Sequence, residues 1–395
     1  MEKKSESHRG LRAVGAVALL LVTACASASP TGVIDLPRLE LAVRNQGVDP
    51  SKVILPYALT PEMRRWVHEK VPSTRSADDR IKLLQESLLN SEEMEVEYQW
   101  GYTGTAREVF EKRRANCLAF TFLFVGMARE IGVPVYFLAV GDSENYRKNA
   151  DLVVISDHIA VGYGAKVNQT IIDFSIDASD EYRLVRPISD LTAIAMYHSN
   201  RGAEALQAGF VNAAVEWLRL AVAIDPELAN ARANLGVALR RRGDQEGAEE
   251  AYRQALEIDP RTYSAYHNLA ALLRFQGREE EARAYEAALR QSPNRNPYTY
   301  ISLGDISLLG GRFEEAEKLY RRAINLGRKN AESYAAMGEL AATEGDLRRA
   351  RKMLRKARKI DAANSRVLRL EASIAQPSAR PNGAWLDQRV STSLR

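Results

Sequence analysis

Two cysteines occur in this chain of 395 residues, and Cys117 stands where a nucleophile would be placed. It follows Asn116, a good helix N-cap, and precedes a largely apolar run over 118–128 that is typical of a helix buried on most sides. We therefore expect Cys117 in the first helical turn, where the helix dipole and backbone N–H groups favour the thiolate. A thiolate performs covalent catalysis. The alternative interpretation is a buried cysteine that packs as a small apolar residue.

A thiol nucleophile needs a base, and His158 is the candidate among the five histidines. It lies in a strand-like run over 152–163, and a second strand-like run follows a turn-rich stretch. A hairpin centred on 165–166 would place His158 directly opposite Asp173, with Cβ atoms about 4.5–5.5 Å apart. In that arrangement the Asp173 carboxylate would hold the imidazole in position.

Three other aspartates compete with Asp173 for the orienting role, namely Asp157, Asp177 and Asp180. Asp157 is adjacent to His158, so in a strand its side chain would point to the opposite face. The pairing register decides between the candidates, because a slip of one residue moves side chains to the other face of a sheet. The register itself is an assumption at this point.

These motifs resemble the core of the transglutaminase-like superfamily over about residues 95–180. The resemblance is carried by Cys117 at the start of a buried helix, by the Arg-x-x-Gly-x-Pro exit over 129–134, and by His158 followed by Asp173. It implies a papain-like fold, in which a helix bearing the cysteine packs on an antiparallel sheet that supplies the histidine and the aspartate. It also implies Cys117 as nucleophile, His158 as base and Asp173 as the orienting residue.

The chain departs from the family pattern at two places. Ala115 stands two residues before Cys117, where the family usually has glycine, and an aliphatic run over 159–161 follows His158, where the family usually has an aromatic residue. These differences weigh more against transglutamination than against the fold. An inactive copy of the domain is the alternative that they leave open.

Stabilisation of an oxyanion would require the Cys117 backbone N–H group and one further donor. The candidates are Asn116, Trp100 and Tyr102, and each also has an ordinary capping or packing role. No second cysteine or histidine lies at ligand-like spacing, so the sequence predicts no metal site and no cofactor.

The first 24 residues have the features of a bacterial lipoprotein signal peptide, with Cys25 as the lipidation site. A basic segment precedes an apolar core that is too short to span a bilayer as a helix. The small residues before Cys25 resemble a lipobox, and Ala26 after it implies sorting to the outer membrane, facing the periplasm. Several acyl chains would anchor the protein to the membrane stably. An ordinary secretory signal cleaved near 27–29 is the alternative.

A 34-residue period begins near residue 195. Pro226 and Pro260 both follow an Ile-Asp pair, and glycine and alanine recur at equivalent places between them and in the neighbouring units. This pattern resembles the tetratricopeptide repeat, with about five units. Small residues are expected where two antiparallel helices cross, with larger residues filling the remaining gap.

Arrays of this kind form a concave groove that holds peptides or partner proteins, so a protein or peptide ligand is the expected partner. First helices face the groove in this family, and those of two units carry the candidates for its lining, namely Arg232, Asn234, Tyr266 and Asn268. The net charge of +4 argues against a dedicated nucleic-acid binder.

The fold class that we expect is an α+β papain-like, transglutaminase-like domain followed by an all-α tetratricopeptide-repeat solenoid. The expected function is a lipid-anchored envelope protein with a Cys-His-Asp thiol acyl-transfer or amide-hydrolysis domain and a protein-binding repeat array. A catalytically silent scaffold is the alternative. The expected segments are a signal peptide (1–24), a tether (25–35), the transglutaminase-like domain (36–190), the repeats with a C-terminal cap (195–375) and a disordered tail (376–395).

Overall fold

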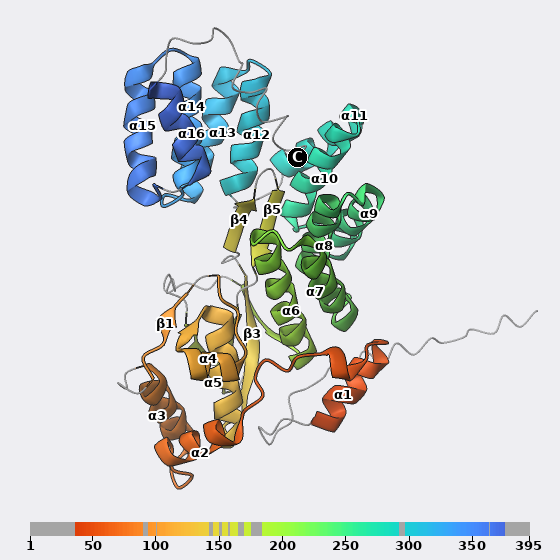
Figure 1. Cartoon of the computed structure of the whole chain (residues 1–395), viewed down its shortest axis with the longest axis vertical. Helices are drawn as coiled ribbons and strands as arrows, with labels where there is room; N and C mark the ends of the chain where they lie inside the picture. The colour runs from red at the N-terminus through yellow and green to blue at the C-terminus, as the bar shows by residue number, and fades with distance from the viewer. Residues whose placement is uncertain are drawn as a thin grey trace, which may run out of the picture.

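The computed structural model shows an α+β region followed by a row of paired helices (Figure 1). The residues that it describes are 36–89, 94–99, 101–141, 145–149, 152–156, 159–164, 170–174, 184–291, 297–362 and 364–375.

The α+β region begins with helices whose starts are set by local capping. Thr60 accepts a hydrogen bond from the Met63 N–H group, and Thr105 and Glu108 form a reciprocal capping box, as their sequence spacing predicts. The elements are α1 (Leu36–Asn45), η1 (Pro50–Lys52), α2 (Pro61–Lys70), α3 (Ala77–Leu89), α4 (Ala106–Lys112) and α5 (Cys117–Glu130). A short parallel pair, β1 (Glu97–Tyr98) and β2 (Arg114–Ala115), lies beside them.

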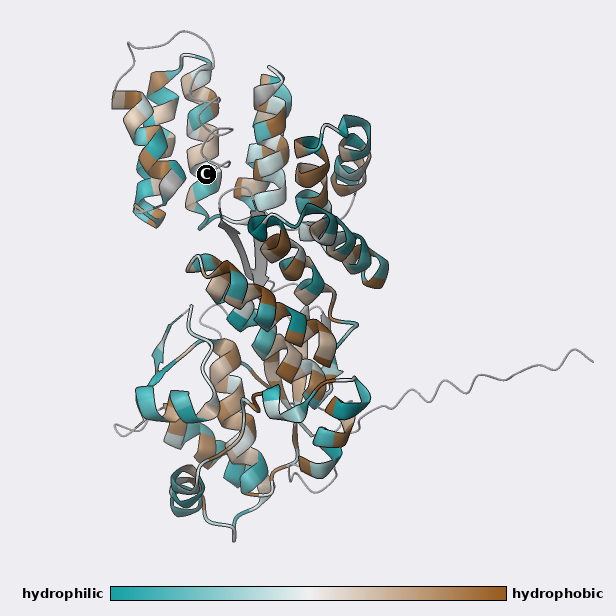
Figure 2. Cartoon of the chain, turned by 45° about the vertical axis from the view of Figure 1, so that its right-hand side comes forward, coloured by the Kyte–Doolittle hydropathy of each residue, from teal (hydrophilic) through white to brown (hydrophobic). Residues whose placement is uncertain are grey.

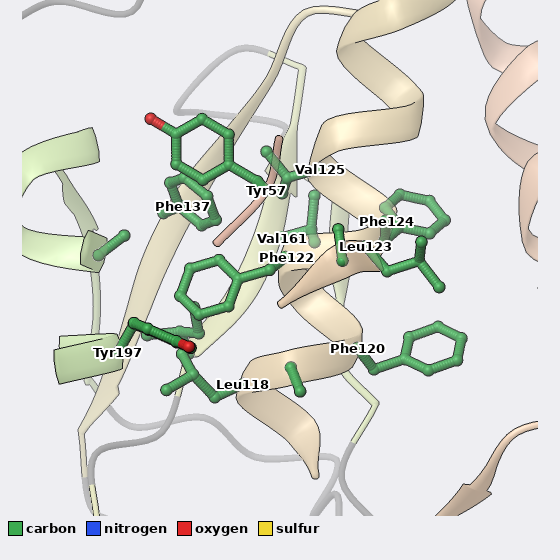
Figure 3. Close-up of a cluster of buried hydrophobic side chains, with 14 of the residues drawn as sticks. Tyr57, Leu118, Phe120, Phe122, Leu123, Phe124, Val125, Phe137, Val161 and Tyr197 are labelled. Carbon is green, nitrogen blue, oxygen red and sulfur yellow. The ribbon is translucent and has the colours of Figure 1, made fainter. Parts of the chain in front are cut away.

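Helix α5 is the centre of the core, and each of its residues from Cys117 to Arg129 is buried. Figure 3 shows Phe122 on the side of the helix that faces Phe137 and Tyr197, with Phe120 and Phe124 on the other side. A helix that is apolar all round must be covered on every side by other elements. The prediction of a helix that is buried on most sides is confirmed.

A four-stranded antiparallel sheet packs against α5. Its strand order is β7 (Thr170–Ile172), β6 (Ile159–Tyr163), β3 (Val135–Gly141) and β8 (Leu184–Ile188). Helix α5 contacts β3 and β6, the two central strands. The arrangement is therefore a helix that begins at Cys117 and lies on an antiparallel sheet.

The prediction of one strand over 152–163 is wrong. Its first part, β5 (Leu152–Ser156), pairs with β4 (Asn145–Asn149) in a separate hairpin, whereas its second part is β6 of the main sheet. The two parts look alike in sequence because both are short aliphatic runs, and periodicity does not reveal that they belong to different sheets.

The predicted register of the second hairpin is wrong by two residues. The predicted pairing would set Val161 opposite Thr170, whereas the structure pairs Val161 with Ile172. Both of these aliphatic side chains are buried, and their burial favours a register that turn composition does not indicate. A shift by an even number leaves each β7 residue on its predicted face.

The helices after the sheet pair two by two into antiparallel units. The first helices of the units contact one another in succession, and we call them the first-helix layer. The helices are α6 (Asp190–Gln207), α7 (Val211–Ile224), α8 (Ala229–Arg242), α9 (Gln245–Ile258), α10 (Tyr263–Phe275), α11 (Glu279–Gln291), α12 (Pro297–Leu309), α13 (Phe313–Leu326), α14 (Ala331–Thr343), α15 (Leu347–Ile360) and α16 (Ser365–Ala375). Figure 2 shows apolar and polar residues interleaved along these helices, as expected for elements with one buried face.

Two kinds of glycine explain the 34-residue period. A Cβ atom on Gly236 would lie 2.5 Å from the Tyr252 ring, and one on Gly304 would lie 2.4 Å from the Tyr320 ring, so the helix crossings require a residue without a side chain. Glycines with positive φ angles lie at equivalent places, at the end of each first helix or just after it. A residue with a side chain would adopt this backbone conformation only with strain. These glycines are Gly209, Gly243, Gly277, Gly311 and Gly345.

The last helix, α16, is held by a buried cluster of charges. The Arg366 guanidinium is 2.6 Å from Asp305 Oδ1 and 2.6 Å from Glu339 Oε2, and both carboxylates come from earlier first helices. Tyr320 donates a hydrogen bond to the same Asp305 oxygen at 2.7 Å. These contacts tie the C-terminal cap to two preceding units.

The α+β region and the first repeats share one core. The cluster of buried side chains around α5 continues into Tyr197, Ile224 and Leu228 of the repeat region. Among the described helices, none has the length and apolar character required to cross a membrane.

Candidate functional site

Cys117 occupies the first turn of α5, as predicted, and is 5% exposed. The Asn116 side chain caps the helix, because its Oδ1 atom accepts a hydrogen bond from the Ala119 N–H group at 2.9 Å. Its Nδ2 atom donates to Thr103 Oγ1 at 2.7 Å. The thiol therefore lies in a buried position at a helix N-terminus, the place where a helix dipole favours negative charge.

The loop before α5 is held in place by the first repeat helix. Glu204 of α6 accepts a hydrogen bond from the Thr103 N–H group at 2.7 Å, and Arg201 donates one to the Thr103 carbonyl at 3.2 Å. Burial raises the pKa of Glu204, and its contacts with Thr103 and Arg201 oppose that shift. Through Thr103 and Asn116, α6 thus supports the position of the helix start at Cys117.

Two contacts bring strands β6 and β7 to the N-terminal half of α5. Thr121 Oγ1 donates to the carbonyl of Ile159, the first residue of β6, at 3.4 Å. The Phe174 ring, just beyond β7, lies with its centroid 4.4 Å from that of Phe120. Asp173 is half-buried and precedes Phe174 directly.

Of the predicted triad, Cys117 and Asp173 lie among the described residues. His158 lies outside them, as do the competing aspartates Asp157, Asp177 and Asp180. The predicted roles of these residues therefore stay predictions.

Among the described oxyanion candidates, the Asn116 carboxamide is engaged in other contacts, whereas the buried Tyr102 hydroxyl has no hydrogen-bond partner within the described residues. Both polar atoms of the Asn116 carboxamide have the structural partners given above. The Tyr102 carbonyl accepts a hydrogen bond from the Asn116 N–H group at 3.2 Å, and the Lys112 ammonium lies 5.4 Å from the centroid of the Tyr102 ring. Trp100 lies outside the described residues, as does the proposed lipidation site Cys25.

Arg129 has a role that the sequence analysis missed. Its guanidinium forms two hydrogen bonds with Asp190 at the start of α6, at 2.7 and 3.0 Å, and it packs over the rings of Tyr57 and Phe137. Tyr57 donates to the same carboxylate at 3.0 Å. The sequence signal for this pairing is a single arginine near the end of an apolar helix, because a buried charge requires a partner.

The four predicted groove residues fall into two pairs. Arg232 donates to Gln254 of the second helix of its unit at 2.6 Å, and the ring of Tyr266 packs against Tyr285 of the paired helix. These two side chains therefore contact the second helices of their own units, and their predicted place in a groove stays a prediction. Asn234 and Asn268 are buried in the first-helix layer.

Comparisons with known proteins concern the repeat region. Three family models, each described as tetratricopeptide repeat, match residues 229–261, 251–284 and 307–374. No curated protein matches the chain.

Solved structures of repeat proteins resemble part of the chain. The pilF protein of Pseudomonas aeruginosa is 27% identical over 46% of this chain and 83% of its own, with a TM-score of 0.38. The thermophilic TPR protein TTC0263 of Thermus thermophilus is 21% identical over 46% of this chain and 97% of its own, with a TM-score of 0.40. YrrB, described as a TPR protein with an unusual peptide-binding site, is 16% identical over 45% of this chain and 92% of its own, with a TM-score of 0.31.

The family models agree with the helix pairs and with the 34-residue spacing of their glycines. Repeats of this class present surfaces that bind proteins or peptides. Residues 229–284 and 307–374 of this chain are tetratricopeptide repeats.

Proposed function

We propose that this protein binds a protein or peptide partner through its repeats and acts on an acyl group of its substrate through Cys117. The observation that carries the catalytic part is the set of contacts at the start of α5. Thr121 meets Ile159 of β6, and Phe120 meets the ring of Phe174, the neighbour of Asp173. These contacts support the proposal, because thiol acyl transfer would need the helix that bears Cys117 to lie close to β6, the strand that follows His158 in the sequence.

The proposed reaction proceeds through a thioester. The Cys117 sulfur attacks the carbonyl carbon of an amide after its proton passes to His158, and Asp173 orients the imidazole. The C–N bond then breaks, and His158 returns the proton to the leaving amine. Attack by water would release an acid, whereas attack by an amine would form a new amide. In both cases the C–S bond breaks and the thiol is restored.

Alkylation of Cys117 by iodoacetamide tests the activated thiol. The full chain with Cys25→Ser has Cys117 as its only thiol, since the sequence contains two cysteines. We expect His158→Ala to slow alkylation at pH 7 at least tenfold and Asp173→Asn to slow it by a smaller factor, because the thiolate loses its base.

His68→Ala is the matched control, because His68 lies half-exposed on α2 and pairs with Glu130. It should leave the alkylation rate unchanged. Equal rates in the parent protein and in His158→Ala would refute the activated thiol.

A catalytically silent scaffold is the second candidate, and the low exposure of Cys117 favours it. A thiol that only fills a core position would be replaceable by a residue of similar size. Full cellular function of Cys117→Ala, together with retained partner capture, would support the scaffold. Loss of function in a Cys117→Ser variant that folds normally would favour the enzyme.

We also place the protein in the bacterial envelope, anchored through a lipid on Cys25. The support is the basic, apolar and small-residue order of the N-terminal sequence. Growth with an alkyne-bearing fatty acid should label the protein, and Cys25→Ala should abolish that label. A label that persists in Cys25→Ala would rule out this anchor.

A further inference from the structure

The hairpin of β4 and β5 lies apart from the main sheet, beside the repeat array (Figure 1). Its second strand, β5, contacts α6, α8 and α10, the first helices of three consecutive units. In the described part of the chain the two strands pair only with each other, so the second edge of β5 belongs to no sheet. A segment of the α+β region, β5, therefore packs against the first-helix layer.

An asparagine occurs at the same place in each of these three helices. Asn200, Asn234 and Asn268 are 34 residues apart, and they are 3%, 1% and 0% exposed. The equivalent positions of the next two units hold Ser302 and Ala336. The helices that carry the asparagine are those against which β5 packs.

The polar groups of this layer suit the edge of a strand. A carboxamide both donates and accepts hydrogen bonds, and a strand edge presents N–H and C=O groups in turn. Within the described part of the chain, the buried Oδ1 atom of Asn200 and the buried hydroxyls of Ser199 and Ser264 have no hydrogen-bond partner. Buried polar atoms are normally paired, so the layer retains capacity to bind a backbone.

The length of β5 also matches the width of the three helices against which it packs. A strand of five residues is about 16 Å long at roughly 3.3 Å per residue. Three neighbouring helices with axes about 8–10 Å apart span about 16–20 Å. An isolated two-stranded hairpin is only marginally stable in water. The hairpin of β4 and β5 therefore depends for its stability on the helices against which it packs. This dependence makes its replacement on those helices by another strand feasible.

We infer that β5 is an intramolecular occupant of the first-helix layer over α6, α8 and α10, the face where repeats of this class bind peptides, and that an extended, aliphatic strand of a partner must displace β5 to bind there. The β5 sequence, Leu-Val-Val-Ile-Ser, indicates the kind of strand that a partner would present. That strand would compete with the hairpin for the same helices. The inference rests on the protein-binding function proposed for the repeats and does not depend on the chemistry of Cys117.

Fluorescence anisotropy with a labelled peptide tests the competition. The probe is a fluorescein-labelled peptide with the sequence of residues 150–158, titrated with the full chain. In Val154→Pro the hairpin is disrupted, because proline cannot continue a paired strand and Val154 pairs with Arg147. We expect Val154→Pro to bind the peptide at least tenfold more tightly than the parent chain.

Two further substitutions in the Val154→Pro chain locate the site. Asn200→Ala should weaken binding at least tenfold, whereas Ser302→Ala, at the equivalent place outside the three helices, should change it less than twofold. Equal peptide affinity of Val154→Pro and the parent chain, or no binding by either, would overturn the inference.

Hydrogen exchange on the unaltered chain gives a measurement that does not depend on how a variant folds. A saturating concentration of the peptide should increase exchange of the β5 amides, because the peptide replaces the hairpin on the helices. Unchanged exchange at saturation would contradict competition. Neither result bears on the alkylation rate of Cys117, so the two proposals fail separately.

Discussion

Single side chains decide what can titrate in this core, and His198 is the clearest example. It lies on α6 with its ring fully buried between Tyr197 and Trp217, at centroid distances of 5.4 and 5.3 Å. Burial lowers the pKa of His198 to about 4, and the backbone of Ile54 opposes part of that shift. The folded protein thus holds His198 neutral at pH values where the unfolded chain protonates it.

The His198 shift predicts a loss of stability in acid. A histidine with a folded pKa of about 4 and an unfolded pKa of 6.5 binds more protons when unfolded between these values, so stability falls as the pH falls through that window. Between pH 7.5 and 4.5 this group should lower the free energy of unfolding by about 2–3 kcal/mol. Urea unfolding of the parent chain and of His198→Gln measures the difference. The same pH dependence in both proteins would contradict the assignment.

Among the elements, α5 shows how closely a buried helix is packed. Gly126 lies near its middle, where a Cβ atom would come within 2.4 Å of the Tyr57 carbonyl oxygen. That oxygen belongs to the backbone, so the neighbouring segment would have to shift as a whole. The glycine allows the chain at Tyr57 to approach the helix that carries Cys117.

Gly126→Ala should therefore destabilise the protein, although alanine normally favours a helix over glycine by about 1 kcal/mol. Overpacking against a fixed backbone typically costs about 1–3 kcal/mol, which we expect to dominate. Gly338→Ala is the matched control, because its Cβ atom would meet the end of the Leu370 side chain, which can rotate away. Chemical denaturation should show the larger loss for Gly126→Ala, and a gain in stability would show the packing argument to be wrong.

At the scale of the whole molecule, the α+β region and the first repeats form one packed unit. Arg129 at the end of α5 and Asp190 at the start of α6 are joined by two hydrogen bonds, and the core around α5 includes Tyr197 and Ile224. The Thr103 contacts with α6 add a second connection beside Cys117. The repeats therefore complete the fold of the region that they follow.

This shared core predicts how fragments behave. A fragment of residues 36–190 lacks the repeat helices that cover α5 and should show neither native near-ultraviolet circular dichroism nor cooperative unfolding, because it exposes apolar surface. A fragment of residues 36–260 keeps the first two units and should unfold cooperatively. Cooperative unfolding of the shorter fragment would mean that the α+β region is independent.

Much of the fold was predictable, because its determinants are close in sequence or repeat along it. Asn116 as a cap, the capping box at Thr105 and the buried helix over 118–128 each depend on neighbours within a few positions. The repeats were predictable because the same small residues return every 34 positions. For the candidate site, the sequence located Cys117 at its helix start but indicated neither its support by Thr103 nor the pairing of β7.

The sequence by itself determined the local and periodic features of this protein, namely the helix that begins at Cys117, its cap and the tetratricopeptide repeats. Only the tertiary structure decided the register of β6 and β7, the partner of Arg129 and the place of β5 on the first-helix layer. The physical reason is the separation of the groups involved. Caps and helix crossings join residues of one turn or one unit, whereas these contacts join segments whose distance in the chain leaves no periodic trace.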